Sequence, residues 1–417
     1  MSYPRAQKIQ CLTDWHGTSV DDPFQWMESD HTSTLEWVRQ QNLYTDQYFK
    51  DSQLDKIRQR LQSNLNYPKL GLPWLENGNC FYFKNDGLQN YSVLYVQNEG
   101  KSLPRAILDL NDFSDVDVSQ SLSGLKLSQD GRFLCYGLSE NGSDWSKWYI
   151  RDVYTGKDLN DCLYHVRYPS VSWAHDNKGF YYSGFASKKD EQDHSLGQRL
   201  YYHRIGTSQH HDELIFEYDK DESIRIQGVV SEDGQYLLVF LSRGAEELHQ
   251  VLFQDISKPN QPFYTLVDGF NAGFRFVGSS GAKFILQTDL NAPNGRVLEF
   301  DGSDPEKISS RELIKEFEEV LVRVSVIDNS FFGIYLKDAH SVVKKFTLEG
   351  EYVYDVDLPG IGTVTGFTGK RDEHKIFYSF SSFATPFHYY IYNAKSNESI
   401  LFWPFNRPML KLVANIT

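Results

Sequence analysis

The stretch "LSQDGRFLCY", residues 127–136, has the pattern of a tight turn that leads into a β-strand. An aliphatic residue precedes a polar Asp-Gly turn, and an alternating aromatic and aliphatic run follows it. Asp-Gly between such runs is a strong short-range hairpin signal, because glycine adopts positive φ without a steric penalty. Taken alone, the segment predicts only one hairpin. To predict the whole fold, we need to know how often the pattern recurs along the chain.

The pattern occurs seven times along the chain. The six other copies are "WLENGNCFYF" (74–83), "WAHDNKGFYY" (173–182), "VSEDGQYLLV" (230–239), "VGSSGAKFIL" (277–286), "VIDNSFFGIY" (326–335) and "FTGKRDEHKIFY" (367–378). A third strand follows each hairpin, as in "HQVLFQDISK" (249–258), and most copies add a short fourth, as in "FYTLVDG" (263–269). Seven four-stranded units predict a mainly β fold, a seven-bladed β-propeller. A series of unrelated hairpins in sandwiches or barrels is the alternative.

Composition and charge narrow the functional classes. The formal net charge of -14, without a block of Lys and Arg, argues against a nucleic-acid partner. Residues 1–30 lack the basic and apolar parts of a secretory signal, and no run approaches the roughly 18 apolar residues of a membrane span. We therefore expect a soluble, cytoplasmic protein with no membrane partner. The four cysteines lie far apart in sequence, which predicts isolated reduced thiols in the core.

The N-terminal segment, residues 1–70, reads as a helical arm rather than as a blade. Apolar residues recur at helical spacing over 30–50, where Ser33 and Glu36 fit a capping box, and a second helix is predicted over 51–65. Blade one is expected to start near Pro73. Because no N-terminal strand is evident for the last blade, we expect side-chain packing alone to join blades one and seven.

Several motifs closely resemble those of the prolyl oligopeptidase family. They are "DDPFQWME" (21–28), "WVRQQN" (37–42), "GLSENGSDW" (137–145) and the "WAHDNKGFYY" copy named above. The resemblance implies an arm at 1–70 that belongs to an α/β-hydrolase domain, a propeller at 71–406, and a tail at 407–417 that begins the return to a catalytic portion this chain does not contain. It also implies that the start at Met1 is the natural N-terminus.

The residues themselves predict no catalytic site. The G-x-S-x-G elbow of serine hydrolases is missing; the nearest segment, 137–142, has one residue too many and lies in a hairpin, and "GSSG" at 278–281 is no better. His210-His211 reads as a solvated turn rather than a metal site. We expect no metal and no cofactor. In the resembled family the serine, aspartate and histidine come from the stretch after the propeller, so no catalytic residue can be assigned here.

Two positions match cavity-facing residues of the resembled family. Tyr168 precedes "SVSW", and Arg243 lies in "LSRGAEE", where Ala245 stands at a position that is cysteine in mammalian members. Ordinary residues at a blade edge are the alternative interpretation of both.

The leading functional hypothesis is the N-terminal and propeller portion of a cytoplasmic serine peptidase that cleaves short peptides after proline. The propeller would gate substrate access, and this chain alone would be inactive. Its partner would be the missing hydrolase domain, in the same or a separate chain. The alternative is a standalone propeller that binds a protein or peptide. The apolar stripes of the arm count against it, because they would be exposed.

Overall fold

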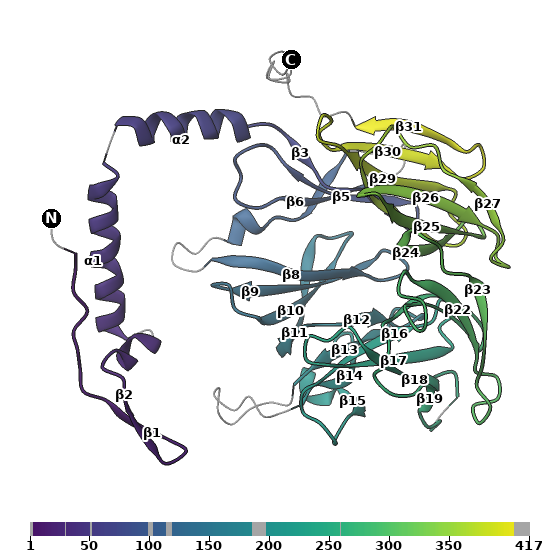
Figure 1. The fold of residues 1–417 in the computed structure, drawn as a ribbon, viewed down its shortest axis with the longest axis horizontal. Helices are drawn as coiled ribbons and strands as arrows, with labels where there is room; N and C mark the ends of the chain where they lie inside the picture. The colour runs from purple at the N-terminus through teal and green to yellow at the C-terminus, as the bar shows by residue number, and fades with distance from the viewer. Residues whose placement is uncertain are drawn as a thin grey trace. The chain divides into compact units, whose positions relative to one another are not determined.

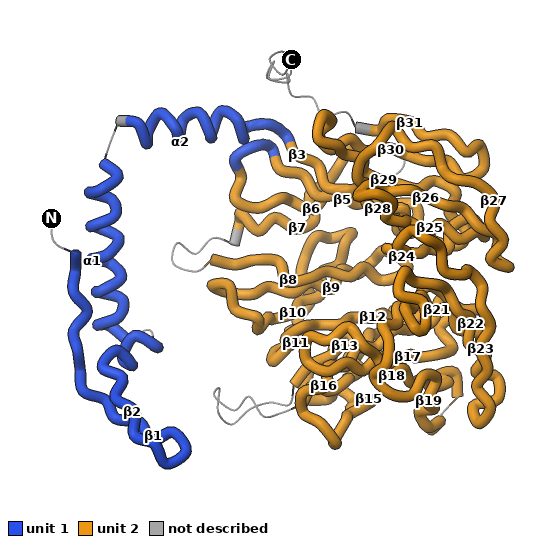
Figure 2. The backbone as a smooth tube through the Cα atoms, in the orientation of Figure 1, with its two compact units in different colours: residues 1–68, 86–88 blue, residues 69–85, 89–417 orange. Residues whose placement is uncertain are grey.

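A computed structural model describes residues 3–29, 31–50, 52–98, 103–113, 119–185, 197–258 and 260–403. The chain forms two compact units: an arm unit of residues 1–68 and 86–88, and a propeller unit of residues 69–85 and 89–417 (Figure 2). The predicted tail at 407–417 lies outside the described residues. Neither α-helix is long and apolar enough to cross a membrane.

The arm unit contains two helices, as expected, and one hairpin. Its elements are β1 (Leu12–Trp15), β2 (Thr18–Asp21), the 3-10 helix η1 (Gln25–Glu28), α1 (Thr32–Tyr48) and α2 (Ser52–Leu65). The expectation that 1–70 is helical was wrong for β1 and β2, which pair antiparallel. His16 and Gly17 form the connecting turn with φ of 53° and 83°, the positive values that two-residue hairpins require.

The predicted capping box is also wrong. Helix α1 begins at Thr32, its N-cap residue is His31, and that residue makes no side-chain cap hydrogen bond. Ser33 is therefore already inside the helix, where its hydroxyl cannot cap the first turn. Glu36 instead accepts hydrogen bonds from Arg39, at 2.7 and 2.8 Å, and from Gln40 at 3.0 Å.

Apolar side chains of the arm helices remain open to solvent. None of the described residues from 3 to 68 is buried. Leu35 of α1 and Ile57 of α2 are both 55% exposed, and Leu61 and Leu65 are similar. The arm helices therefore gain little stability from burial, which is the main source of helix stability in proteins.

We expect the arm unit to be cleaved by protease well before the blades. Trypsin should cut first at Lys56, Arg58 and Arg60 of α2, because local opening of an unburied helix costs little free energy. Mass spectrometry of a digestion time course would identify the cuts. Equal survival of arm and blades would contradict this expectation.

The propeller unit follows the predicted repeat: each blade is an antiparallel sheet, and in blades two to seven the strands pair in chain order (Figure 1). Blade one comprises β3 (Lys69–Leu70), β4 (Trp74–Glu76), β5 (Asn79–Asn85), β6 (Val93–Asn98) and β7 (Arg105–Leu108). Both β3 and β4 pair with β5, so its first strand begins before Pro73, not at it. The 3-10 helix η2 (Leu110–Phe113) follows. Blade two comprises β8 (Gln120–Leu127), β9 (Phe133–Glu140), β10 (Trp145–Asp152) and β11 (Lys157–Arg167).

The remaining blades each have four strands. Blade three comprises β12 (Val171–Trp173), β13 (Gly179–Gly184), β14 (Arg199–Arg204) and, after the 3-10 helix η3 (Gln209–His211), β15 (Glu213–Glu217). Blade four comprises β16 (Ile224–Val230), β17 (Tyr236–Arg243), β18 (His249–Asp255) and β19 (Tyr264–Val267). Blade five comprises β20 (Phe274–Ser280), β21 (Lys283–Thr288), β22 (Arg296–Asp301) and β23 (Ser309–Ile314). Blade six comprises β24 (Val320–Ile327), β25 (Ser330–Lys337), β26 (His340–Phe346) and β27 (Tyr352–Asp355). Blade seven comprises β28 (Thr363–Thr368), β29 (Lys375–Ser381), β30 (His388–Asn393) and β31 (Glu398–Trp403). The seven-bladed β-propeller is thereby confirmed.

The turn that opened the sequence analysis has a defined hydrogen-bond pattern. The buried Ser128 hydroxyl donates to Asp130 at 2.6 Å and accepts from the Phe133 N–H at 2.9 Å, while Gly131 adopts a φ of 69°. The copy in blade four repeats it from Ser231, with the same two distances to its Asp and following aromatic residue. The Ser-x-Asp-Gly spacing thus encodes a closed turn, because its serine satisfies backbone and carboxylate together.

Apolar clusters join each blade to the next. One cluster contains Phe81 and Leu94 of blade one with Leu134 of blade two, and five similar clusters link blades two to seven in succession. None of the four cysteines, all of which lie in the described part of the chain, forms a disulfide. Only Cys135 is buried; the other three are half-buried, so the expectation of core thiols holds for Cys135 alone.

The contact between blades one and seven is of a different kind. No apolar cluster of the described residues spans these two blades. Instead Lys370 forms an ion pair with Glu76, and the Tyr389 hydroxyl donates to the Leu70 carbonyl. Burial raises the pKa of Glu76 from its ordinary value, although the hydrogen bond and charge of Lys370 oppose the shift. The ring is therefore joined here by polar contacts between side chains and backbone.

Replacing Lys370 by Met should destabilise the chain by about 1 kcal/mol at pH 7, discounted because the lysine is partly exposed. Because the pKa of Glu76 is raised above its ordinary value of 4.5 in the folded chain, Glu76 loses its charge as pH falls toward 4.5, and the loss of stability should shrink over the same range. Urea unfolding at pH 7 and pH 4, with the exposed Lys307→Met as control, measures it. An equal loss at both pH values would contradict this account.

Candidate functional site

Tyr168 lies in the connection between β11 and β12 and holds a cluster of charged groups. Its φ of 51° is positive, a strained conformation for a bulky residue. The hydroxyl donates to Asp144 and accepts from Arg167, each at 2.9 Å. The Arg225 guanidinium of β16 lies 4.0 Å from the ring centroid, within cation–π range. Tyr168 is 41% exposed, so this cluster is open to solvent on one side.

A buried glutamine fixes this arrangement. Gln198 donates from Nε2 to the carbonyls of Arg167 at 3.1 Å and Tyr168 at 3.3 Å. Its Oε1 accepts from the Ile226 N–H at 2.6 Å. One side chain of blade three thus holds the strained backbone at Tyr168 to the strand that carries Arg225.

Arg243 lies in blade four, on the strand that pairs with the strand of Arg225. It ends β17, and in the β16–β17 register it is adjacent to the residue paired with Arg225. Its Nε is 3.8 Å from Asp221, and its guanidinium lies 4.4 Å from the Phe270 ring centroid. Its side chain is 53% exposed. Arg225 therefore stacks on the Tyr168 ring and lies on the strand that pairs with the strand of Arg243. The sequence analysis did not identify Arg225.

The loop after Arg243 leads to the centre of the ring. Ala245 is exposed in the β17–β18 loop, and the next two residues, Glu246 and Glu247, line a cavity of about 830 Å³. Lys126, Gln227, Arg275 and Arg323, from the first strands of blades two, four, five and six, also line it. First strands contact one another between blades two and three, three and four, five and six, and six and seven, so they face the centre of the ring. The cavity that they line belongs to the central channel.

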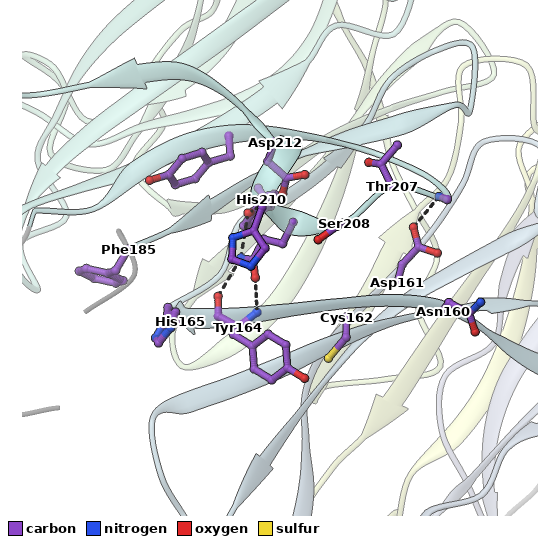
Figure 3. Close-up of a pocket in the computed structure, with 14 residues that line it drawn as sticks. Asn160, Asp161, Cys162, Tyr164, His165, Phe185, Thr207, Ser208, His210 and Asp212 are labelled. Atoms are coloured by element: carbon purple, nitrogen blue, oxygen red, sulfur yellow. Dashed lines mark hydrogen bonds between the residues drawn. The ribbon is translucent and has the colours of Figure 1, made fainter. Parts of the chain in front are cut away.

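A second pocket, of about 580 Å³, lies between the outer strand of blade two and blade three. Asp161 of β11 and Asp212, which precedes β15, both line it (Figure 3). His203 of β14 is fully buried between them: Nδ1 is 2.7 Å from Asp212 and Nε2 is 3.0 Å from Asp161. Asp212 also accepts from Tyr182 at 2.8 Å.

This buried triad joins two blades rather than catalysing a reaction. Both imidazole nitrogens of His203 face carboxylates, so neither is free to take a proton from a nucleophile. Burial lowers the pKa of His203, but the hydrogen bonds and charges of Asp212 and Asp161 outweigh it, and the pKa is raised from its ordinary value. A protonated His203 can donate to both carboxylates at once.

His203→Gln should cost about 3 kcal/mol at pH 6, because two buried carboxylates lose their cation. Because the pKa of His203 is higher in the folded chain than in the unfolded chain, its protonation stabilises the fold. This stabilisation is complete below the unfolded pKa of about 6.5, and it is lost as pH rises through the folded pKa. The difference from wild type should therefore be smaller at pH 9. Urea unfolding at both pH values measures it, with the exposed His210→Gln as control. A loss that grows with pH would contradict a protonated His203.

The other candidate residues occupy ordinary positions. Ser139, in the segment nearest to a nucleophile motif, lies within β9 and shares a hydrogen bond of 2.8 Å with Ser121. His210 and His211 are exposed in η3, and the part of the chain that the structure describes holds no group of three metal-ligating side chains.

These features define a class: a seven-bladed propeller with a charged central channel, preceded by a helical unit. Residues 3–402 match the family model for the prolyl oligopeptidase N-terminal β-propeller domain, so the chain belongs to this family. The prolyl endopeptidase of Elizabethkingia miricola is 33% identical over 93% of this chain and 55% of its own length. That of Elizabethkingia meningoseptica is 31% identical over 96% and 56%.

Solved structures agree with the fold. A structure from a study of two prolyl endopeptidases, 28% identical, superposes with a TM-score of 0.87 over 98% of this chain and 61% of its own. Prolyl oligopeptidase B of Galerina marginata, 22% identical, has the same fold with a TM-score of 0.83. The chain spans a little over half the length of the curated relatives it matches.

Proposed function

We propose that this chain is the N-terminal and propeller portion of a serine peptidase that cleaves short peptides after proline. The observation that carries the proposal is the alignment with prolyl endopeptidases, which takes in nearly all of this chain but only 55–56% of those proteins. An α/β-hydrolase portion would supply the nucleophile, base and orienting carboxylate, and the chain alone would be inactive. The cytoplasm remains the predicted location.

The exposed apolar side chains of the arm unit support the proposal that another domain covers it. Its helices expose Leu35, Ile57, Leu61 and Leu65, and no described residue from 3 to 68 is buried. Exposed apolar side chains on two successive helices are typical of a surface that another domain covers. We propose that the hydrolase portion packs on this surface.

The propeller would then limit access to the catalytic portion. In this proposal short peptides reach it through the central channel, whereas folded proteins are too large to pass. Tyr168 and Arg243 would contact the bound peptide. An aromatic ring with a free edge packs against apolar side chains, and an exposed guanidinium donates to peptide carbonyls.

The endogenous polypeptide, captured with an antibody against the blades, tests the proposal. We expect an intact mass well above 48.3 kDa and release of a fluorescent amine placed after proline in a short peptide. The purified 417-residue chain should release none, and neither preparation should cleave a folded substrate. A captured mass of 48.3 kDa with no hydrolase chain bound would overturn the proposal and favour a binding propeller.

In the complete enzyme, Arg243→Gln should lower kcat/KM for the short peptide about 10-fold, the effect of losing one charged hydrogen bond of about 1.4 kcal/mol. Tyr168→Ala should act similarly, through lost packing. Arg204→Gln, at the exposed end of β14, is the matched control. Steady-state kinetics measures the effect, and kcat/KM unchanged in both variants would leave the two residues at an ordinary blade edge.

A further inference from the structure

Two arginines project toward the central cavity from adjacent blades. Arg275 lies on β20 of blade five and Arg323 on β24 of blade six, both first strands, and both residues line the cavity of about 830 Å³. Each is exposed to the solvent of the channel. The first strands of these two blades also contact each other. The cavity wall therefore carries two neighbouring positive charges.

A glutamine holds the two strands in register. Gln287 of β21 pairs directly with Arg275 across the sheet. Its Nε2 donates to the carbonyls of Leu321 at 3.0 Å and Val322 at 3.3 Å, and its Oε1 accepts from the Val324 N–H at 3.1 Å. These three backbone groups flank Arg323 on both sides. Gln287, the cross-strand neighbour of Arg275, thus holds the backbone around Arg323. The backbone positions of both arginines are therefore fixed before a ligand binds.

Neither arginine has an acidic partner among the described residues. No carboxylate lies within ion-pair distance of Arg275 or Arg323 there, although two other arginines of blade five are paired: Arg296 with Glu312 at 3.2 Å and Arg311 with Glu299 at 2.7 Å. The chain has 56 acidic and 42 basic residues, so carboxylates are not scarce. The described part of the chain thus leaves two cations on one cavity wall without an ion-pair partner.

Electrostatics agrees with the geometry. The pKa of the Arg323 guanidinium is lowered, first by burial and then by the charge of Arg275. The side chain is open to solvent but confined within the channel, which explains why an exposed group is still penalised for its charge. A bound anion would relieve the repulsion between the two guanidinium groups.

We propose that Arg275 and Arg323 form a site in the channel that binds a carboxylate of a short peptide. The inference rests on the proposed peptidase function for the choice of a peptide. Guanidinium groups match the two oxygens of a carboxylate through paired N–H donors. The C-terminal carboxylate and an acidic side chain share this chemistry, and the experiment separates them.

The rest of the cavity favours a peptide over a phosphate group. Glu246, Glu247 and Asp289 also line it, and their charges disfavour a multiply charged anion. Phe276 and Val322 provide apolar wall for the side chains of a peptide. The volume of about 830 Å³ far exceeds that of a single ion, and it lies within the range of ligand-binding cavities.

Calorimetric titration of the 417-residue chain tests the site with three proline-containing pentapeptides. One has a free C-terminus and no acidic side chain, the second is its C-terminal amide, and the third is an amide with one internal Glu. We expect the free acid or the Glu peptide to bind at least 10-fold more tightly than the plain amide. Whichever is preferred identifies the source of the carboxylate.

Arg275→Gln and Arg323→Gln should each abolish this preference without changing the affinity for the plain amide. Arg323→Lys, which keeps the charge but lacks the forked donors, should retain part of it, and Arg204→Gln should leave it intact. Thermal unfolding of every variant checks that it is folded.

Equal affinity of wild type for all three peptides, or no binding at millimolar concentration, would overturn the site. So would inorganic phosphate that displaces the peptide where the same concentration of acetate does not. These readouts require no hydrolysis. If the titration shows no carboxylate preference, the peptidase proposal is unaffected. If the antibody-captured protein has no peptidase activity, the result of the titration is unaffected.

Discussion

The constraint on which the rest of this structure depends is that a four-stranded blade has two apolar faces and cannot bury both alone. Each described cluster between blades joins one face to its neighbour, as Phe240 of blade four and Phe284 of blade five do in a single core. Six such clusters connect seven blades in sequence. The stability of the propeller is therefore approximately a sum of the contributions of successive blade interfaces, as in other repeat proteins. The blades can stay packed without a seventh apolar cluster between blades one and seven.

Because the blade faces carry the apolar packing, the first strands are free to present polar side chains to the centre. Arg225 and Arg275 occupy such strands, and neither takes part in the described apolar clusters. In the same way a polar contact, the Lys370–Glu76 ion pair, can join blades one and seven, since the apolar clusters lie between the other blades. Function and stability thus lie on different surfaces of the same blades.

The fold could be predicted from the sequence because its signals are local. The Ser-x-Asp-Gly turns of blades two and four close through their own hydroxyl and carboxylate, and the other blades repeat a polar turn followed by an apolar strand. The His203 triad and the Arg275–Arg323 pair could not be predicted, because their members are 9 to 51 residues apart and come together only when the blades pack. The Ser33 capping box failed for a related reason: a pattern of residue types does not fix where a helix begins.

Two glutamines explain why the polar groups of this propeller lie where a ligand could meet them. Gln198 and Gln287 each donate to two successive carbonyls and accept one N–H, and each holds a backbone segment beside an arginine, Arg225 or Arg323. A charged side chain on an exposed strand would otherwise lose conformational entropy on binding a ligand. Fixing its backbone in advance reduces that loss. The glutamines bear no charge and leave the guanidinium groups free, so they orient the cations without neutralising them.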